Sequence, residues 1–266
     1  MKGTTMGNSF AVLAAIGLVL GATGAYGASI NEIRTDQGGS DIDEYFELAG
    51  SPSESLDGLS YLVIGDGTGS GAGGAVEAIV SLAGLTIPAD GYFLAVEDTF
   101  TLGGSPDLTL VGSGTSQTLN FENSDNVTHL LVQGLNAAIH TGDGFGSNAS
   151  DLDLNDDGVI DATGDWDGDT LDDGAPWAAI LDSVALSENV PSEDLVYSST
   201  IVGPDGTFVP GHVFRFPNGS GAWHIGGFTL DTDDTPGVAN VPEPTATALM
   251  LLAGAGLLGM ARRTGH

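Results

Sequence analysis

Short apolar runs separated by turn-forming residues dominate the pattern of this chain. The runs are bounded by Gly, Asp, Asn and Pro, which is typical of short β-strands. Between residues 29 and 240, no stretch sustains an apolar period of 3.6 residues for three helical turns. We therefore predict an all-β fold, an antiparallel sandwich. Its strands are expected at Ser29–Ile33, Glu44–Leu48, Ser60–Gly65, Glu77–Ser81, Tyr92–Val96, Leu108–Leu110, Gln117–Phe121, Val127–Val132, Ile180–Leu186, Thr207–Phe208, Val213–Phe216 and Ala222–His224.

The first 28 residues have the pattern of a signal peptide. Lys2 precedes an apolar run over residues 10–20, and Ala25-Tyr26-Gly27 forms an A-x-G cleavage pattern. We expect a signal helix and removal by signal peptidase near Gly27 or Ala28. The chain contains no cysteine. An exported domain without disulfides needs another source of stability, and bound metal is the obvious one.

The last 26 residues have three parts: Val241-Pro242-Glu243-Pro244, an apolar run over residues 246–261, and the pair Arg262-Arg263. The prolines keep the first part extended. The uncharged run predicts a transmembrane helix, short at about 16 residues, with the arginines on the cytoplasmic side. Residues 231–244 are predicted to form a stalk between the domain and this helix.

That order of parts resembles the PEP-CTERM sorting signal of Gram-negative bacteria, which is read by an exosortase. The resemblance implies an exported protein of the cell envelope, outer surface or extracellular matrix, with exopolysaccharide as a possible matrix component to contact. It also implies only transient anchoring in the inner membrane. A plain C-terminal membrane anchor would have the same topology.

The segment between the two terminal signals is strongly acidic. Residues 28–240 hold 35 acidic side chains and only two basic ones, Arg34 and Arg215, which gives a net charge of −33. Two cations cannot neutralise a phosphate backbone, so nucleic-acid binding is excluded. Such repulsion opposes compaction unless cations screen it.

Six segments resemble a lamin tail domain: Ile30–Ile33, Glu44–Leu48, Leu56–Tyr61, Ile87–Ala95, Leu181–Leu186 and Thr235–Asn240. The resemblance implies an immunoglobulin-like β-sandwich over residues 29–240, used for binding or scaffolding, with an acidic insert at about 143–176. Two positions depart from the family pattern, because Ala49-Gly50 replaces an aromatic-Asn pair and Tyr61 replaces a Trp.

Ten of the 23 residues from Asp151 to Asp173 are aspartate. Clustered carboxylates repel one another and need a hard cation or full solvation. Residues 153–161 reproduce nine positions of an EF-hand-type calcium loop and resemble a dockerin repeat. The expected Ca²⁺ ligands are the side chains of Asp153, Asn155, Asp157 and Asp161 and the carbonyl of Val159.

The twelfth position of this loop is Gly164 instead of an acid, and Asp165 follows it. Asp165 also opens a second acidic loop that resembles thrombospondin type-3 repeats. The expected ligands of the second loop are Asp165, Asp167, Asp169 and Asp172. The alternative for both loops is a solvated acidic segment without bound metal.

Motifs for catalysis are missing from the sequence. There is no G-x-S-x-G, P-loop, H-E-x-x-H or dinucleotide fingerprint. His129 is expected on a sheet face, and His212 at a surface or edge. We therefore expect a structural or adhesive protein, not an enzyme. The alternatives are a surface hydrolase and a carbohydrate-binding accessory protein, in which Tyr45, Tyr92 or Trp223 could stack on sugars.

Overall fold

The computed structural model describes residues 27–40, 42–65, 73–111, 119, 121, 125–142, 149–188, 195–230 and 233–241. The predicted signal helix, the predicted membrane helix and the sorting residues Pro242, Glu243, Pro244, Arg262 and Arg263 lie outside these ranges. Val241 is described. In the described ranges, no helix is long and apolar enough to span a bilayer.

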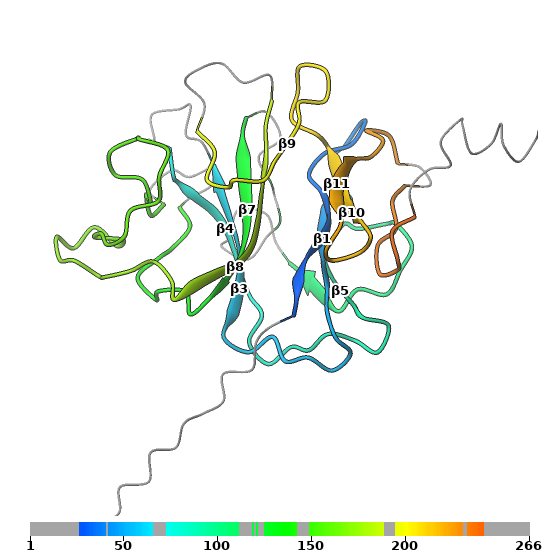
Figure 1. The fold of residues 1–266 in the computed structure, drawn as a ribbon, viewed down its shortest axis with the longest axis horizontal. Coiled ribbons are helices and arrows are strands. Elements are labelled where there is room, and N and C mark those ends of the chain that lie inside the picture. The colour runs from blue at the N-terminus through cyan, green and yellow to red at the C-terminus, as the bar shows by residue number, and fades with distance from the viewer. Residues whose placement is uncertain are drawn as a thin grey trace, which may run out of the picture.

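The described residues form an all-β fold of two sheets (Figure 1). The six-stranded sheet has the order β11-β10-β1-β2-β5-β6, and the five-stranded sheet has the order β4-β3-β7-β8-β9. The strands are β1 (Ser29–Arg34), β2 (Tyr45–Ala49), β3 (Leu59–Gly65), β4 (Val76–Ser81), β5 (Tyr92–Glu97), β6 (Leu108–Leu110), β7 (Val127–Gln133), β8 (Ala179–Leu186), β9 (Ile201–Val202), β10 (His212–Phe216) and β11 (Ala222–Ile225).

The main core lies between the two sheets. It contains buried side chains from both, such as Ile30, Phe46 and Phe93 from one sheet and Val63 and Leu131 from the other. The rings of Phe46 and Tyr61 stack across the layer with centroids 3.7 Å apart. Tyr61 therefore supplies an aromatic contact between the sheets.

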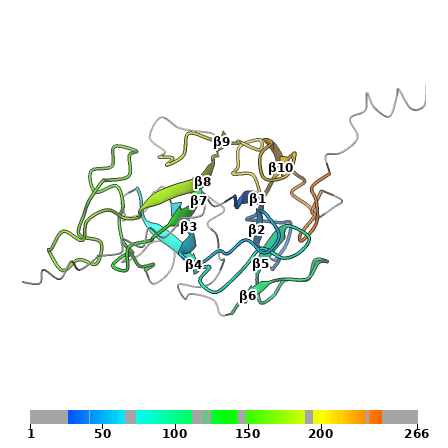
Figure 2. The ribbon, with the colours of Figure 1, turned by 60° about the horizontal axis from the view of Figure 1, so that its bottom comes forward.

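A second core covers the outer face of the five-stranded sheet. Successive strand residues point to opposite faces, so Leu62 and Ile64 of β3 face away from the main core. They pack with Leu152 and Trp166 of the acidic insert. Figures 1 and 2 show the insert beyond β3 and β4, on the side away from the six-stranded sheet. Since both faces of β3 are covered, all seven of its residues are buried.

The predicted strands agree with the structure within one or two residues in most places, but the expectation of purely antiparallel sheets is wrong. β6 pairs parallel to β5, and β9 pairs parallel to β8. Segments of 10 and 14 residues separate the strands of these two pairs, in place of the two-residue turn that can join an antiparallel pair. The predicted strand Thr207–Phe208 is reduced to one bridge between Asp205 and Phe208. Most of the predicted strand Gln117–Phe121 lies outside the described residues.

Candidate calcium loops and the docked C-terminal segment

The two acidic loops repeat one another with an offset of twelve residues. In the first loop, the carboxylate of Asp153 accepts the backbone N–H of Asp157 at 3.1 Å and that of Gly158 at 2.8 Å. In the second loop, the carboxylate of Asp165 accepts the N–H of Asp169 at 3.0 Å and that of Thr170 at 2.7 Å. The first aspartate of each loop thus closes the turn in the same way.

The correspondence extends through each loop. Further bonds run from Asp157 N–H to Asn155 Oδ1, and from Asp169 N–H to Asp167 Oδ1, both at 3.1 Å. The sixth residues, Gly158 and Thr170, both have positive φ, at 79° and 76°. Glycine adopts this conformation easily, whereas a β-branched residue rarely does. Thr170 therefore keeps the turn that the sequence pattern assigns to glycine.

The ninth position distinguishes Asp173 from Asp172. Asp161 Oδ2 accepts the N–H of Leu154 at 2.9 Å, and the equivalent Asp173 Oδ2 accepts the N–H of Trp166 at 2.8 Å. One carboxylate oxygen from each of Asp165, Asp167 and Asp173 lies within 4.8 Å of the others. Asp172 instead accepts the N–H of Gly174 at 2.8 Å. Asp173, which the predicted ligand set does not include, therefore stands at the position equivalent to Asp161, and aligning the loops at an offset of twelve would have found it.

The oxygen-bearing residues of each loop are of the kind that binds a hard cation, although among the described residues only the second loop brings three carboxylates within 4.8 Å of one another. Ca²⁺ prefers carboxylate, amide and backbone carbonyl oxygens, and the first loop offers Asp153, Asn155, Asp157, Asp161 and the carbonyl of Val159. Neither loop has an acid at its twelfth position, where Gly164 and Pro176 stand. Each loop therefore lacks the bidentate ligand that strengthens an EF-hand.

The first loop is joined to the second core through Asp153. Its side chain is fully buried, and its Oδ2 accepts the hydroxyl of Tyr197 at 3.1 Å. Burial, followed by the Asp153 charge, raises the pKa of Tyr197, so this hydroxyl stays protonated and donates. Ile160 packs partly buried against the same core, as the EF-hand pattern predicts for the eighth position.

The second loop is joined to this core through Trp166, which is 1% exposed. Its indole N–H donates to the carbonyl of Gly174 at 2.9 Å. Both loops are therefore seated on the sheet by apolar side chains, while most of their other carboxylates face outward.

Residues 233–241, the C-terminal segment, pack against the six-stranded sheet. Arg34 of β1 pairs with Asp234, with 2.5 Å between Nη2 and Oδ1. The carboxylate of Glu32 accepts the N–H and the hydroxyl of Thr235 at 2.9 and 2.8 Å. The prediction of a stalk over residues 231–244 is therefore wrong for the described part, because buried polar groups of β1 attach it to the domain.

The end of the C-terminal segment is held in the same way. The carboxylate of Glu47 in β2 accepts the N–H of Gly237 at 2.6 Å. Asn240 is 2% exposed; its N–H donates to Asn218 Oδ1 at 2.8 Å, and its amide donates to the carbonyls of Asn31 and Arg215. The next residue, Val241, is exposed. The folded domain therefore extends to Asn240.

His212 is part of this attachment. It is fully buried, and its Nε2 lies 2.9 Å from Glu32 Oε1. The surface or edge position expected from the sequence is wrong, because the C-terminal segment covers this face of the sheet. His129 does lie in a strand of the sheet, but within the core, where its Nδ1 is 2.8 Å from the hydroxyl of Tyr61. Burial lowers the pKa of His129 to about 3, so the ring is neutral.

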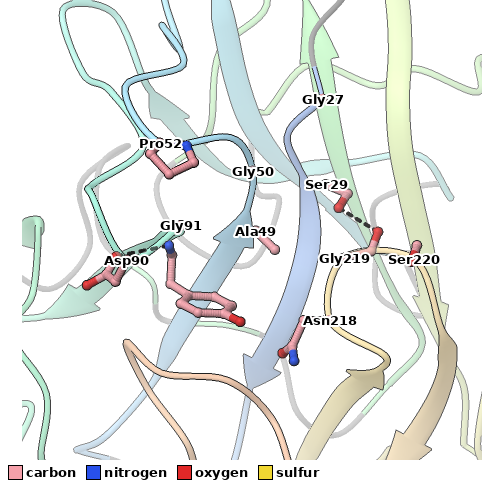
Figure 3. A pocket seen from close by; sticks show the side chains of 11 residues that line it. Gly27, Ser29, Ala49, Gly50, Pro52, Asp90, Gly91, Asn218, Gly219 and Ser220 are labelled. Carbon is pink, nitrogen blue, oxygen red and sulfur yellow. Dashed lines mark hydrogen bonds between the residues drawn. The ribbon is translucent and has the colours of Figure 1, made fainter.

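An open hollow of about 390 Å³ lies where the ends of β1, β2 and β5 meet the turn after β10 (Figure 3). Four glycines, Ser29, Asp90, Tyr92 and Asn218 are among its lining residues. Of the three aromatic residues proposed for sugar stacking, Tyr45 is fully buried and cannot contact a ligand. Tyr92 lines the hollow, and Trp223 lies under the guanidinium of Arg215, 4.7 Å from the ring centroid.

A family model described as the PEP-CTERM protein-sorting motif matches residues 240–263. The chain carries a PEP-CTERM sorting motif. The motif indicates exosortase-dependent export and sorting to the cell envelope or surface of a Gram-negative bacterium. Its first matched residue, Asn240, is also the last buried residue of the domain. No curated protein and no solved structure matches the chain.

Proposed function

We propose that this PEP-CTERM protein is a calcium-stabilised structural or adhesive domain of the cell envelope or extracellular matrix. The observation that carries the proposal is the repetition of one hydrogen-bonding scheme in two acidic loops at an offset of twelve residues. Two turns with the same hydrogen-bonding scheme, in the second of which three carboxylates lie within 4.8 Å of one another, are the arrangement that a pair of Ca²⁺ sites would need. The domain is the cargo, and exosortase and signal peptidase process it during export.

The proposed affinity follows from the ligands. Each loop offers carboxylates but has no twelfth-position acid, so we place its Kd with extracellular calcium modules, at about 0.1–1 mM. A ligand that binds only the native state at ten times its Kd stabilises by about 1.4 kcal/mol per site. Two filled loops would then contribute roughly 3 kcal/mol and would lower the repulsion within a domain of charge −33.

Calorimetry tests this proposal directly. The melting temperature of the exported full chain would be measured with 5 mM CaCl₂, with 5 mM MgCl₂ and with a chelator. We expect Ca²⁺ to raise the melting temperature by ~5 °C or more and Mg²⁺ to have a smaller effect, because Mg²⁺ gives up its water reluctantly. An equal response to both ions would indicate general charge screening and would contradict specific calcium loops.

The proposed fold is an immunoglobulin-like sandwich of the lamin tail type, which fits a binding or scaffolding role. Two facing sheets and a core contributed by both support this assignment. A role without catalysis is also proposed. The buried group of Glu32, His212 and Asp234 supports it, since these side chains are engaged with β1, β2 and the C-terminal segment, and none lies in the open hollow.

Carbohydrate binding is a second candidate function, favoured by the position of Tyr92 at the hollow. A sugar ring can stack on an exposed aromatic face while Asp90 and Asn218 supply hydrogen bonds. A glycan array probed with the wild type and with Tyr92→Ala tests it. Loss of specific binding in the variant supports the function, and absence of any wild-type binding rules it out for the glycans present.

A further inference from the structure

Glu54 lies beside the first residues of β1. Its Oε1 accepts the backbone N–H of Gly27 at 2.5 Å and that of Ala28 at 2.9 Å. Its Oε2 accepts the N–H of Ser51 at 3.0 Å. The backbone of Glu54 is also fixed, because its N–H donates to Ser51 and its carbonyl accepts from Ile87, both at 2.9 Å. This carboxylate is thus held in one place and directed at the start of the domain.

The residues that it contacts flank a predicted cleavage point. With Ala25 and Gly27 as the small residues before the scissile bond, signal peptidase would cut between Gly27 and Ala28. Hydrolysis consumes one water molecule, leaving a carboxylate on Gly27 and an α-ammonium group on Ala28. We propose that Glu54 is the binding site for this α-ammonium group, and that the site is completed only by cleavage at this bond.

The geometry already fits the product. The nitrogen of Ala28 lies 2.9 Å from Oε1, which is the separation of a charge-assisted N–H···O hydrogen bond. Ala28 is 5% exposed and belongs to the main core, so its position does not depend on the signal peptide. A cut after Ala28 would remove a core residue together with the nitrogen that contacts Glu54. The structure therefore favours one of the two bonds that the sequence leaves open.

The charges around the site favour a cation. Between residues 28 and 241, the only basic side chains other than histidine are Arg34 and Arg215, and they pair with Asp234 and Asp182. Other charges near the start of β1 include the Asp182–Arg215 pair, whose aspartate accepts the N–H of Ile30, Asp90 at the hollow, and Glu47, which accepts the amide of Asn31. The α-ammonium group would be a third fixed cation in this acidic domain.

The small number of lysines allows the α-amine to be measured without interference from other amines. Lys2 is the only lysine and lies in the signal peptide, so the mature chain has a single amine, the α-amine itself. The full chain would be exported in an expression host and purified in detergent, and intact mass would identify its first residue. The pH dependence of the acetylation rate with acetic anhydride then gives the pKa of the amine.

We expect a chain that begins at Ala28, with an α-amine pKa about one unit above the ordinary 7.7–8.0. Glu54→Gln keeps the shape of the side chain and should return this pKa to the ordinary range. Because the native pKa is raised, the interaction stabilises fully below about pH 7.7 and is lost as the pH rises through the native pKa. Acetylation at pH 7 should lower the melting temperature of the wild type by ~2 °C. In Glu54→Gln, the acetylated and unacetylated forms should melt at the same temperature.

Asp90→Asn is the matched control, because Asp90 lines the hollow that Gly27 also lines and no hydrogen bond joins its carboxylate to the Ala28 nitrogen; the variant should keep the raised pKa. An ordinary pKa in the wild type overturns the proposal. So does an equal loss of melting temperature on acetylation in the wild type and Glu54→Gln. Two acetylated amines per chain, or a first residue other than Ala28, would also overturn it. If Glu54→Gln fails to fold, the pH dependence of the wild-type acetylation rate still tests the proposal, because it shows whether the pKa of the α-amine is raised.

Discussion

The guanidinium of Arg34, in the first strand, pairs with the carboxylate of Asp234, and both side chains are buried. This contact joins the first strand to the C-terminal segment, 200 residues later. Arg34 Nη1 and Nη2 also donate to the carbonyls of Asp36 and Gly227, at 2.9 and 3.1 Å. The arginine therefore fixes three parts of the chain around one charge.

Removing the acidic partner should be costly. Asp234→Ala leaves the charge of Arg34 buried without its counter-ion, and we expect a loss of about 3–5 kcal/mol in the free energy of unfolding. Asp182→Ala breaks the more exposed pair with Arg215 and should cost less, roughly 1–2 kcal/mol including the lost bond to Ile30. Urea unfolding of both variants measures the difference; equal losses would contradict the role given to the buried pair.

Gly104 should be essential for seating the C-terminal segment. It has a φ of +107°, and a Cβ atom there would lie 2.6 Å from the carbonyl oxygen of Pro236. Gly104→Ala should therefore displace residues 233–241 and destabilise the domain by about 2 kcal/mol or more. Gly103→Ala is a close control, since nothing lies within 4 Å of its added Cβ.

Limited proteolysis reports on the same variants. Displacement of the C-terminal segment in Gly104→Ala should speed cleavage near Val238–Val241, while Gly103→Ala should resemble the wild type. The seating argument fails if the two alanine variants are cleaved at the same rate.

His129 should make the stability depend on pH. Burial lowers its pKa to about 3, whereas the unfolded chain protonates it near 6.5. As the pH falls through 6.5, the unfolded state takes up a proton that the native state does not, so stability is lost. Between pH 7 and 5 this loss should reach about 2 kcal/mol.

A variant isolates this contribution. His129→Gln removes the titrating ring while keeping an acceptor for Tyr61, so its unfolding free energy should change by about 2 kcal/mol less than the wild type's between pH 7 and 5. Burial and the nearby charge of Glu32 raise the pKa of Glu47, which acts in the opposite direction, but Glu47 is present in both proteins and cancels. Identical pH profiles would show that His129 is not the cause.

The neighbouring residues Asp172 and Asp173 distinguish the ligand set predicted from the sequence from the one that the structure favours. Asp173 lies with Asp165 and Asp167, whereas Asp172 bonds the N–H of Gly174. Asp173→Asn should therefore weaken calcium binding to the second loop by tenfold or more, and Asp172→Asn by less than threefold. Calorimetric Ca²⁺ titration measures both. The reverse order would favour the ligand set read from the sequence.

The strands were predictable because each is an apolar run ended by turn residues, and this local signal needs no knowledge of the partner strand. The turn of the first acidic loop was also predictable, because Gly158 stands at the sixth position and Ile160 at the eighth. The sequence pattern did not distinguish Asp173 from the adjacent Asp172. Only an alignment of the two loops at an offset of twelve shows that Asp173 is equivalent to Asp161.

Other features depend on residues far apart in the sequence. From their charge, Glu32 and Arg34 would be placed on the solvent-facing side of a strand. In the structure, residues 233–241 cover both side chains. The burial of His212 follows from the same cover, so no local pattern could reveal it. β9 is only two residues long, and its Ile201 is exposed, which leaves too little apolar signal to detect.

The anchoring of Asn240 sets how the domain would be presented to the sorting enzyme. Five residues separate Asn240 from the predicted membrane helix at Ala246, and even fully extended they reach roughly 17–20 Å. So short a tether keeps the attachment point of the domain close to the membrane. In every copy delivered, the part of the domain around Asn240, where it contacts β1, β10 and the turn at Asn218, would lie nearest to the membrane and the enzyme.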